Sequence, residues 1–146
     1  MTLHRLLPVA LGICPLLLMH PAMATETSTD LTKVVFHIDD ASTGRFALYL
    51  AEDHLSINPN MKITIAAYAG GVDFLLKGAM DKKSELYAPD IKKLMDLGVQ
   101  FRFCAATLRF RDLDKDKVLP GVEFVPSGTY EIIRLQAEEG YAYLKP

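Results

Sequence analysis

From Lys33 to Pro146, short β-branched runs alternate with longer amphipathic runs, and turn residues separate them. Continuous apolar runs of this kind are typical of strands that are covered on both faces. Strands that alternate with helices through short connections favour a parallel sheet between helical layers. The pattern therefore predicts the α/β fold class: a three-layer α/β/α domain around a mostly parallel five-stranded sheet.

The predicted strands share short β-branched or alternating patterns, and they cover 33–38, 61–68, 99–103, 121–125 and 141–144. Helices are expected at 45–57, 89–97, 105–112 and 128–139, with a short helical piece at 72–76 and a charged loop at 77–85. Apolar spacing places Phe46, Tyr49, Leu50 and Ile57 on the buried face of the first helix, and Tyr130, Ile133 and Ala137 on that of the last.

Residues 1–24 have the features of a secretory signal peptide, with Arg5 before a short apolar run and a small-x-small end at Ala22 and Ala24. The run is too short for a confident bilayer span, and Pro8, Pro15 and Pro21 in and just after it disfavour a helix. We therefore expect cleavage after Ala24, a periplasmic or secreted protein, and no stable membrane span after cleavage. The rival interpretation is an uncleaved N-terminal anchor. Residues 25–32 are expected to be a flexible lead-in, which leaves 33–146 as a single domain.

The charge balance bears on the kind of partner. The chain has a formal net charge of −2, which offers no electrostatic footprint for nucleic acid or an anionic membrane surface. Cys14 lies in the predicted leader, so Cys104 is the one cysteine of the expected mature chain. In an oxidising compartment such a thiol is buried, joined to another chain, or reactive. The absence of a Cys-x-x-Cys motif excludes a thioredoxin-type dithiol mechanism.

Cys104 is the candidate catalytic residue because it falls where a strand is predicted to end and a helix to begin. Unpaired N–H groups at a helix start favour an anion, and Arg109 would add positive potential. The alternative is a small buried hydrophobic residue that happens to contain sulfur.

Other candidate binding residues follow the predicted strands, because ligands of parallel sheets gather outside the carboxyl ends of the strands. These rim candidates are His37, Asp39, Gly70, Gly71 and Ser127. Each also has a purely structural interpretation: a packed strand histidine, a turn carboxylate, two turn glycines and the cap of the last helix. Either Ser42 or Thr43 is expected to cap the first helix. The sequence predicts no metal and no cofactor.

Several ordered segments carry a family resemblance: Gly98-Val-Gln-Phe-Arg-Phe-Cys104-Ala-Ala-Thr-Leu108, Leu119-Pro-Gly-Val122, Val125-Pro-Ser-Gly128, Leu135-Gln136 and Gly140-Tyr-Ala-Tyr143 with Pro146. Together they resemble the DsrE/DsrF-like family, in its YchN-like branch of small exported proteins. The resemblance implies a flavodoxin-like three-layer architecture and homo-oligomers, often trimers or hexamers. It also implies a cysteine that carries sulfur as a persulfide, at the position of Cys104. The sequence Arg109-Phe-Arg111 lacks the glycine that often follows the arginine in the sulfur carriers.

The leading hypothesis is an exported DsrE-like protein that binds or relays sulfane sulfur through Cys104. A thiol-bearing sulfur donor or acceptor would then be its partner. The alternative is a non-catalytic oligomeric module that binds a small anion or a protein partner, with Cys104 buried. A third interpretation, nucleotide or flavin binding, rests on fold analogy alone, and Gly70-Gly71 lacks the phosphate-binding patterns.

Overall fold

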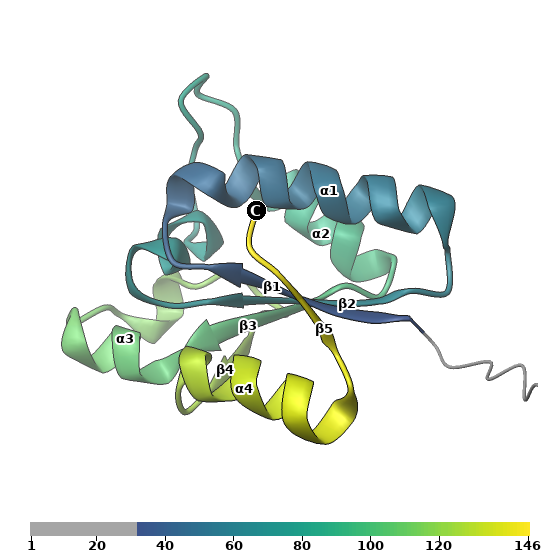
Figure 1. Ribbon diagram of the computed structural model, residues 1–146. Coiled ribbons are helices and arrows are strands. Elements are labelled where there is room, and N and C mark those ends of the chain that lie inside the picture. Colours follow the sequence, from purple (N-terminus) through teal and green to yellow (C-terminus); the bar gives the residue numbers. More distant parts are fainter. Residues whose placement is uncertain (1–31) are drawn as a thin grey trace, which may run out of the picture.

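The computed structural model describes residues 32–146 (Figure 1). Its five strands form one sheet in the order β4-β3-β2-β1-β5, and every neighbouring pair is parallel. The strands are β1 (Lys33–Ile38), β2 (Lys62–Ala67), β3 (Gln100–Cys104), β4 (Glu123–Val125) and β5 (Ala142–Leu144). The predicted α/β class and five-stranded sheet are confirmed. The predicted leader, and the lead-in up to residue 31, lie outside the described residues.

Helices cover both faces of the sheet, with α1 and α2 on one side and α4 on the other (Figure 1). The α-helices are α1 (Gly44–Ile57), α2 (Ala88–Asp96), α3 (Ala105–Phe110) and α4 (Gly128–Glu139). Three 3₁₀ helices lie in the connections between strands and α-helices: η1 (Ala41–Thr43), η2 (Ala69–Leu75) and η3 (Lys115–Lys117). Among residues 32–146, none of the helices has the length and apolar character needed to cross a membrane.

The core has two parts because the side chains of a strand alternate between its faces. In β1, Phe36 and Ile38 are buried in the cluster that contains the inner residues of α1 and α2. Val35 is buried in a smaller cluster with Ile132 and Leu135 of α4. Both sheet faces are therefore packed, which explains the near-continuous apolar run of this strand.

The predicted buried stripe of α1 is wrong for three of its four residues, and only Leu50 packs against the core. The helix buries Ala47, Leu48, Ala51 and Leu55, whereas Phe46 and Tyr49 are more than half exposed. Two apolar stripes with helical spacing run along α1, and the one that contains small alanines faces the sheet. Small side chains let the helix approach the sheet closely, which the large rings would prevent.

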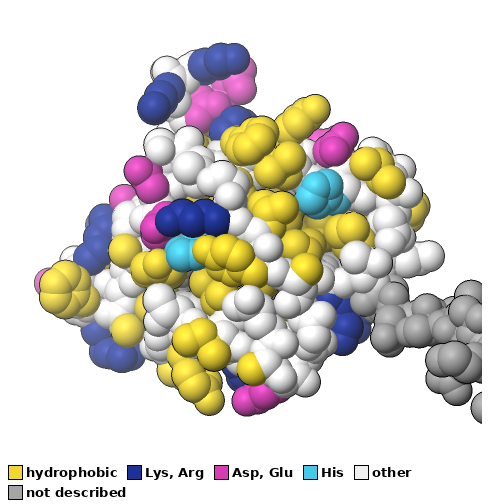
Figure 2. Space-filling model, viewed as in Figure 1, with side chains coloured by type: hydrophobic (Ala, Val, Ile, Leu, Met, Phe, Trp, Pro, Cys, Tyr) yellow, Lys and Arg dark blue, Asp and Glu magenta, His cyan; other side chains and the backbone are white. Residues whose placement is uncertain are grey.

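The predicted stripe of α4 is wrong in the same way. Tyr130 and Ile133 are largely exposed, while Glu131, Ile132 and Leu135 are buried. Glu131 is buried together with a partner, because Arg134 donates two hydrogen bonds to its carboxylate. Figure 2 shows apolar side chains gathered on the surface over α1 and α4.

The predicted cap of the first helix is also corrected. Asp40 takes the capping role, and its carboxylate accepts the N–H of Ser42 at 2.8 Å at the start of η1. Thr43 precedes α1 without a side-chain capping bond, and its hydroxyl donates to the carbonyl of Asp40 at 3.0 Å. At the last helix the prediction is confirmed, because Ser127 Oγ accepts the N–H of Tyr130 at 3.4 Å.

Candidate functional site

Cys104 lies between two connections that leave the sheet on opposite faces. The chain after β2 passes through η2 toward α2, whereas the chain after β4 enters α4 on the other face (Figure 1). Cys104 ends β3, the strand between β2 and β4. In open α/β sheets, ligand sites lie outside the carboxyl ends of the strands, where connections change faces. The fold therefore places Cys104 at a position suited to a binding site.

The Cys104 side chain takes the role that a serine or aspartate usually has at a helix start. Cys104 is the N-cap residue of α3, and its Sγ accepts the N–H of Thr107 at 3.4 Å. The start of α4 packs against the same side chain, since a Cβ added to Gly128 would lie 3.2 Å from Cys104 Cβ. The starts of α3 and α4 also meet directly, because the N–H of Ala106 donates to the carbonyl of Pro126 at 3.2 Å.

These contacts favour the thiolate. Burial by itself raises the pKa of Cys104, but hydrogen bonds from the Thr107 hydroxyl and from the amides of Gly128, Thr107 and Ala106 outweigh it. The pKa of Cys104 is consequently lower than that of an ordinary cysteine. The residue is only 5% exposed. The site therefore combines a stabilised sulfur anion with restricted access from solvent.

Thr107 is the residue that sequence reasoning missed. Besides its contacts with Cys104, its hydroxyl accepts the N–H of Ala69 at 2.9 Å and so joins α3 to the start of η2. The Cys-x-x-Thr spacing was the available signal, because a residue three positions after an N-cap is the one that the cap side chain reaches.

A hollow of about 420 Å³ opens beside this site. We call it the Phe110 hollow, and it is lined by Tyr68, Ala69, Gly70, Ala106, Thr107, Phe110 and Arg111. Thr107 belongs both to its lining and to the groups that contact Cys104 Sγ. The Phe110 ring stands at its edge and is 92% exposed.

Arg109 was expected to place a positive charge near the thiol. It lies exposed in the last turn of α3. Within residues 32–146 its side chain forms no ion pair, whereas Arg111 donates to Asp73 at 2.7 Å and to the Ala69 carbonyl at 3.0 Å. Arg111 is therefore the arginine that the fold holds in place beside the Phe110 hollow.

His37 and Asp39 form a cluster with groups that sequence reasoning did not connect, and Tyr68 belongs both to this cluster and to the lining of the Phe110 hollow. His37 Nδ1 lies 2.6 Å from the Tyr143 hydroxyl, and Nε2 lies 2.7 Å from the Tyr68 hydroxyl. Lys145 donates to Asp39 at 2.6 Å. Burial lowers the pKa of His37, and the nearby Lys145 lowers it further, while Asp39 opposes both effects. Both imidazole nitrogens of His37 contact tyrosine hydroxyls, so His37 does not pair with Cys104.

The remaining rim candidates have structural contacts. Gly71 packs against the end of β1 so closely that an added Cβ would lie 2.1 Å from the Ile38 carbonyl oxygen. Gly70 is exposed and lines the Phe110 hollow. Ser127 caps α4. In the described part of the chain, no group of three potential metal ligands comes together.

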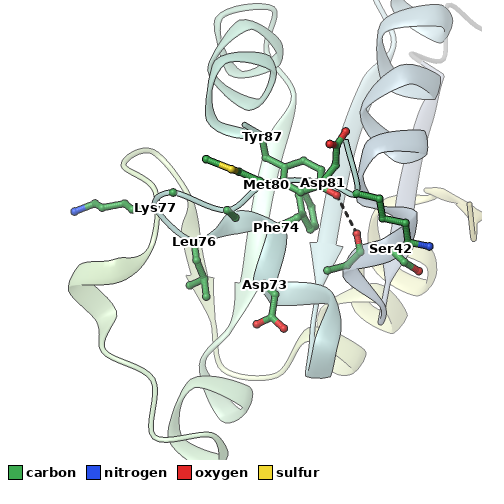
Figure 3. Close-up of a pocket in the computed structure, with 12 residues that line it drawn as sticks. Ser42, Asp73, Phe74, Leu76, Lys77, Met80, Asp81 and Tyr87 are labelled. Atoms are coloured by element: carbon green, nitrogen blue, oxygen red, sulfur yellow. Dashed lines mark hydrogen bonds between the residues drawn. The ribbon is translucent and has the colours of Figure 1, made fainter. Parts of the chain in front are cut away.

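A second hollow, of about 460 Å³, lies at the end of η2 (Figure 3), whereas the Phe110 hollow lies at its start. Its walls come from η1, η2 and the segment 76–87, and the Tyr87 hydroxyl donates to the Ala41 carbonyl at 3.3 Å within it. Asp73, the partner of Arg111, lies at its edge (Figure 3). Cys104 lines neither hollow, but Ala106 and Thr107 of the first turn of α3 line the Phe110 hollow.

Comparison with known proteins assigns the family. The chain is similar to a solved protein of unknown function, MTH1491 from Methanobacterium thermoautotrophicum, with 33% identity and a TM-score of 0.68 over 79% of this chain and 99% of that one. The fold is also similar to that of the ychN protein from E. coli, with 17% identity and a TM-score of 0.66 over 80% and 100% of the two chains. No curated protein matches the chain. Residues 24–146 match the DsrE/DsrF-like family model, and the chain therefore belongs to the DsrE/DsrF-like family.

Proposed function

We propose that this protein binds sulfane sulfur as a persulfide on Cys104 and passes it to an acceptor thiol. The observation that carries the proposal is the position of Cys104 at two helix starts: its Sγ accepts the Thr107 N–H at the start of α3, and Gly128 at the start of α4 packs against its side chain. Helix starts stabilise negative charge on sulfur, whether it is a thiolate or a persulfide anion. Membership in a family of sulfur-relay-type proteins supports the same role.

The proposed transfer has two balanced steps. The Cys104 thiolate attacks the sulfane sulfur of a persulfide or thiosulfonate donor, and the donor's sulfur–sulfur bond breaks as its remainder leaves with the electron pair. An acceptor thiolate then attacks the outer sulfur of the Cys104 persulfide. That attack releases the Cys104 thiolate, so the cycle needs no external oxidant or reductant.

The decisive experiment is intact-mass measurement after treatment with a sulfane sulfur donor. The mass of the wild-type protein should increase by one sulfur atom, and a thiol reductant should remove that sulfur. Cys104→Ser should gain none. A folded wild-type protein whose mass never changes would exclude the relay role.

Burial of Cys104 supports a second candidate function, a non-catalytic module that binds a small anion or a protein partner. At 5% exposure the thiol has the environment of a structural cysteine. This function predicts slow alkylation of Cys104 under native conditions, at every pH at which the protein stays folded. A rate that rises with pH and reaches its plateau below the range of an ordinary cysteine would instead favour the relay.

We further propose that the protein is exported and that its copies assemble as a trimer or hexamer. The exposed apolar side chains of α1 and α4, among them Phe46, Tyr49 and Ile133, support assembly because contiguous apolar surface is typical of interfaces. Light scattering coupled to size-exclusion chromatography gives the mass of the assembly. Phe46→Asp and Ile133→Asp test the two helix faces separately, and N-terminal sequencing of protein recovered from the periplasm tests export.

A further inference from the structure

We propose that the Phe110 hollow binds the apolar organic group of a low-molecular-weight sulfur donor. This proposal rests on the proposed function of Cys104 and narrows its donor to an organic sulfane sulfur compound, such as an organic thiosulfonate. The structural basis is the junction of an apolar hollow with the amide groups that hold Sγ.

The first turn of α3 contacts the Cys104 thiol and also lines the hollow. The Thr107 amide donates to Cys104 Sγ at 3.4 Å, and Thr107 lines the Phe110 hollow together with Ala106. A donor whose organic group occupied the hollow would therefore keep its sulfur next to the first turn of α3. Holding the donor sulfur close to the thiol raises the rate of their reaction, because less entropy is lost on reaching the transition state.

The lining favours an apolar group. Alanine and glycine form much of the wall, and the Phe110 ring at its edge is 92% exposed. None of the described residues covers that ring. A ligand that covers it removes apolar surface from water, which is favourable in proportion to the area.

The charges of the site disfavour a donor with a second anionic group. The cation in the lining, Arg111, already donates to the Asp73 carboxylate and to the Ala69 carbonyl. A second anionic group in the hollow would lose its hydrating water and would find no cation free to pair with it, and such desolvation is costly. Inorganic thiosulfate should consequently be a poorer donor than an organic thiosulfonate, whose single charge is placed largely at the sulfane sulfur.

Access to the thiol favours a small donor over a protein thiol. Cys104 is 5% exposed, so a cysteine on a globular partner cannot readily reach its sulfur. The hollow, at about 420 Å³, is larger than the roughly 150 Å³ apolar cavity that suffices for benzene in an engineered protein. A phenyl-sized group fits within it.

The expected reaction with benzenethiosulfonate is balanced. The Cys104 thiolate forms a bond to the sulfane sulfur, the bond between that sulfur and the sulfonyl sulfur breaks, and benzenesulfinate leaves with the electron pair. Cys104 retains the sulfane sulfur as a persulfide anion. No proton, oxidant or reductant is consumed.

The experiment compares benzenethiosulfonate, methanethiosulfonate and thiosulfate as donors to the full chain, with intact mass as the readout. Each rate is divided by the rate of the same donor with free cysteine at the same pH. The normalised rate for the benzene compound should exceed that for the methane compound about tenfold or more. Phe110→Ala should remove most of this preference. The control Leu97→Ala, which truncates an apolar side chain that is 54% exposed at the end of α2, should retain it.

A second measurement does not depend on sulfur transfer. Benzenesulfinate should slow the alkylation of Cys104 by iodoacetamide in the wild type and in Leu97→Ala, whereas methanesulfinate should not. Equal normalised rates for the two thiosulfonates, together with no protection by benzenesulfinate, would overturn the hollow proposal while persulfide formation stands. Protection by benzenesulfinate with no sulfur gained from any donor would exclude the relay role and leave an apolar binding site.

Discussion

Thr107 is hydrogen-bonded to Cys104 and to the start of η2 at the same time. Its N–H donates to Cys104 Sγ at 3.4 Å, while its hydroxyl accepts the N–H of Ala69 at 2.9 Å. The Thr107 side chain and backbone both contribute to the lowered pKa of Cys104. One threonine therefore couples the ionisation of the thiol to the position of the segment that follows β2.

Thr107→Val tests this coupling, because it removes the hydroxyl and keeps a similar shape. We expect the pKa of Cys104 to rise, since its thiolate loses a donor, and the free energy of unfolding to fall by about 0.5–1.5 kcal/mol. The rate of iodoacetamide alkylation as a function of pH measures the change. Thr64→Val is the matched control. It also removes a buried threonine hydroxyl, but the Thr64 hydroxyl lies in β2 and donates to Gln100 of β3, not to Cys104. An unchanged alkylation midpoint in Thr107→Val would contradict the assigned role.

Gly71→Ala should be strongly destabilising. The new Cβ would lie 2.1 Å from the Ile38 carbonyl oxygen and 2.5 Å from its carbon, and backbone cannot rotate aside as a side chain can. We expect a loss of about 3 kcal/mol or more in the free energy of unfolding. Gly70→Ala is the neighbouring control, where the new Cβ would meet one backbone oxygen, that of Asp39, at 3.3 Å. Urea denaturation of both variants measures the difference, and equal losses would show that η2 can move away from β1.

Ser127→Ala should weaken the start of α4. Ser127 Oγ accepts the N–H of Tyr130, and loss of such a cap costs about 1 kcal/mol. Thermal unfolding followed by circular dichroism measures this loss. Ser42→Ala provides the comparison, because Asp40 and not Ser42 caps the turn before α1. If Ser42→Ala destabilised the protein as much as Ser127→Ala, the assignment of these two caps would be incorrect.

His37 should make stability depend on pH. Burial, the largest effect, lowers the pKa of His37 below 6.5, and Lys145 and Asp39 act on it in opposite directions. Below this pH the unfolded chain binds a proton that the folded chain does not bind. The contribution to stability is therefore complete above pH 6.5 and decreases as the pH falls toward the folded-state pKa.

The titration of the His37 ring in NMR spectra measures this pKa directly, and the midpoint should lie below 6.5. His37→Gln should lose less stability than the wild type when the pH falls from about 7.5 to about 5.5, because the titrating ring is absent. A folded-state midpoint above 6.5 would reverse the predicted slope.

Local pattern was sufficient for the element order. The strands and the main helices have their own periodicity and their own stop residues, such as Gly140 in the left-handed conformation after α4. The choice between two apolar stripes was different. Phe46 and Ala47 both belong to stripes with helical spacing, and packing against the sheet selected the stripe with the smaller side chains.

The site also has features that local sequence predicts and features that depend on the tertiary structure. Cys104 was identifiable because its position between a strand and a helix is a local property, and so was Ser127 as a cap. The contacts of Gly128 with Cys104, and of His37 with Tyr68 and Tyr143, join segments that are distant in the chain. They depend on strand order, which no local pattern contains.

The amino-acid sequence by itself determined the α/β class, the five strands and the thiol at the end of the third. Only the tertiary structure decided that a second helix start meets that thiol and that an apolar hollow opens beside it. The physical reason is that periodicity and capping act within a few residues, whereas the pKa and the exposure of a side chain depend on every segment packed against it.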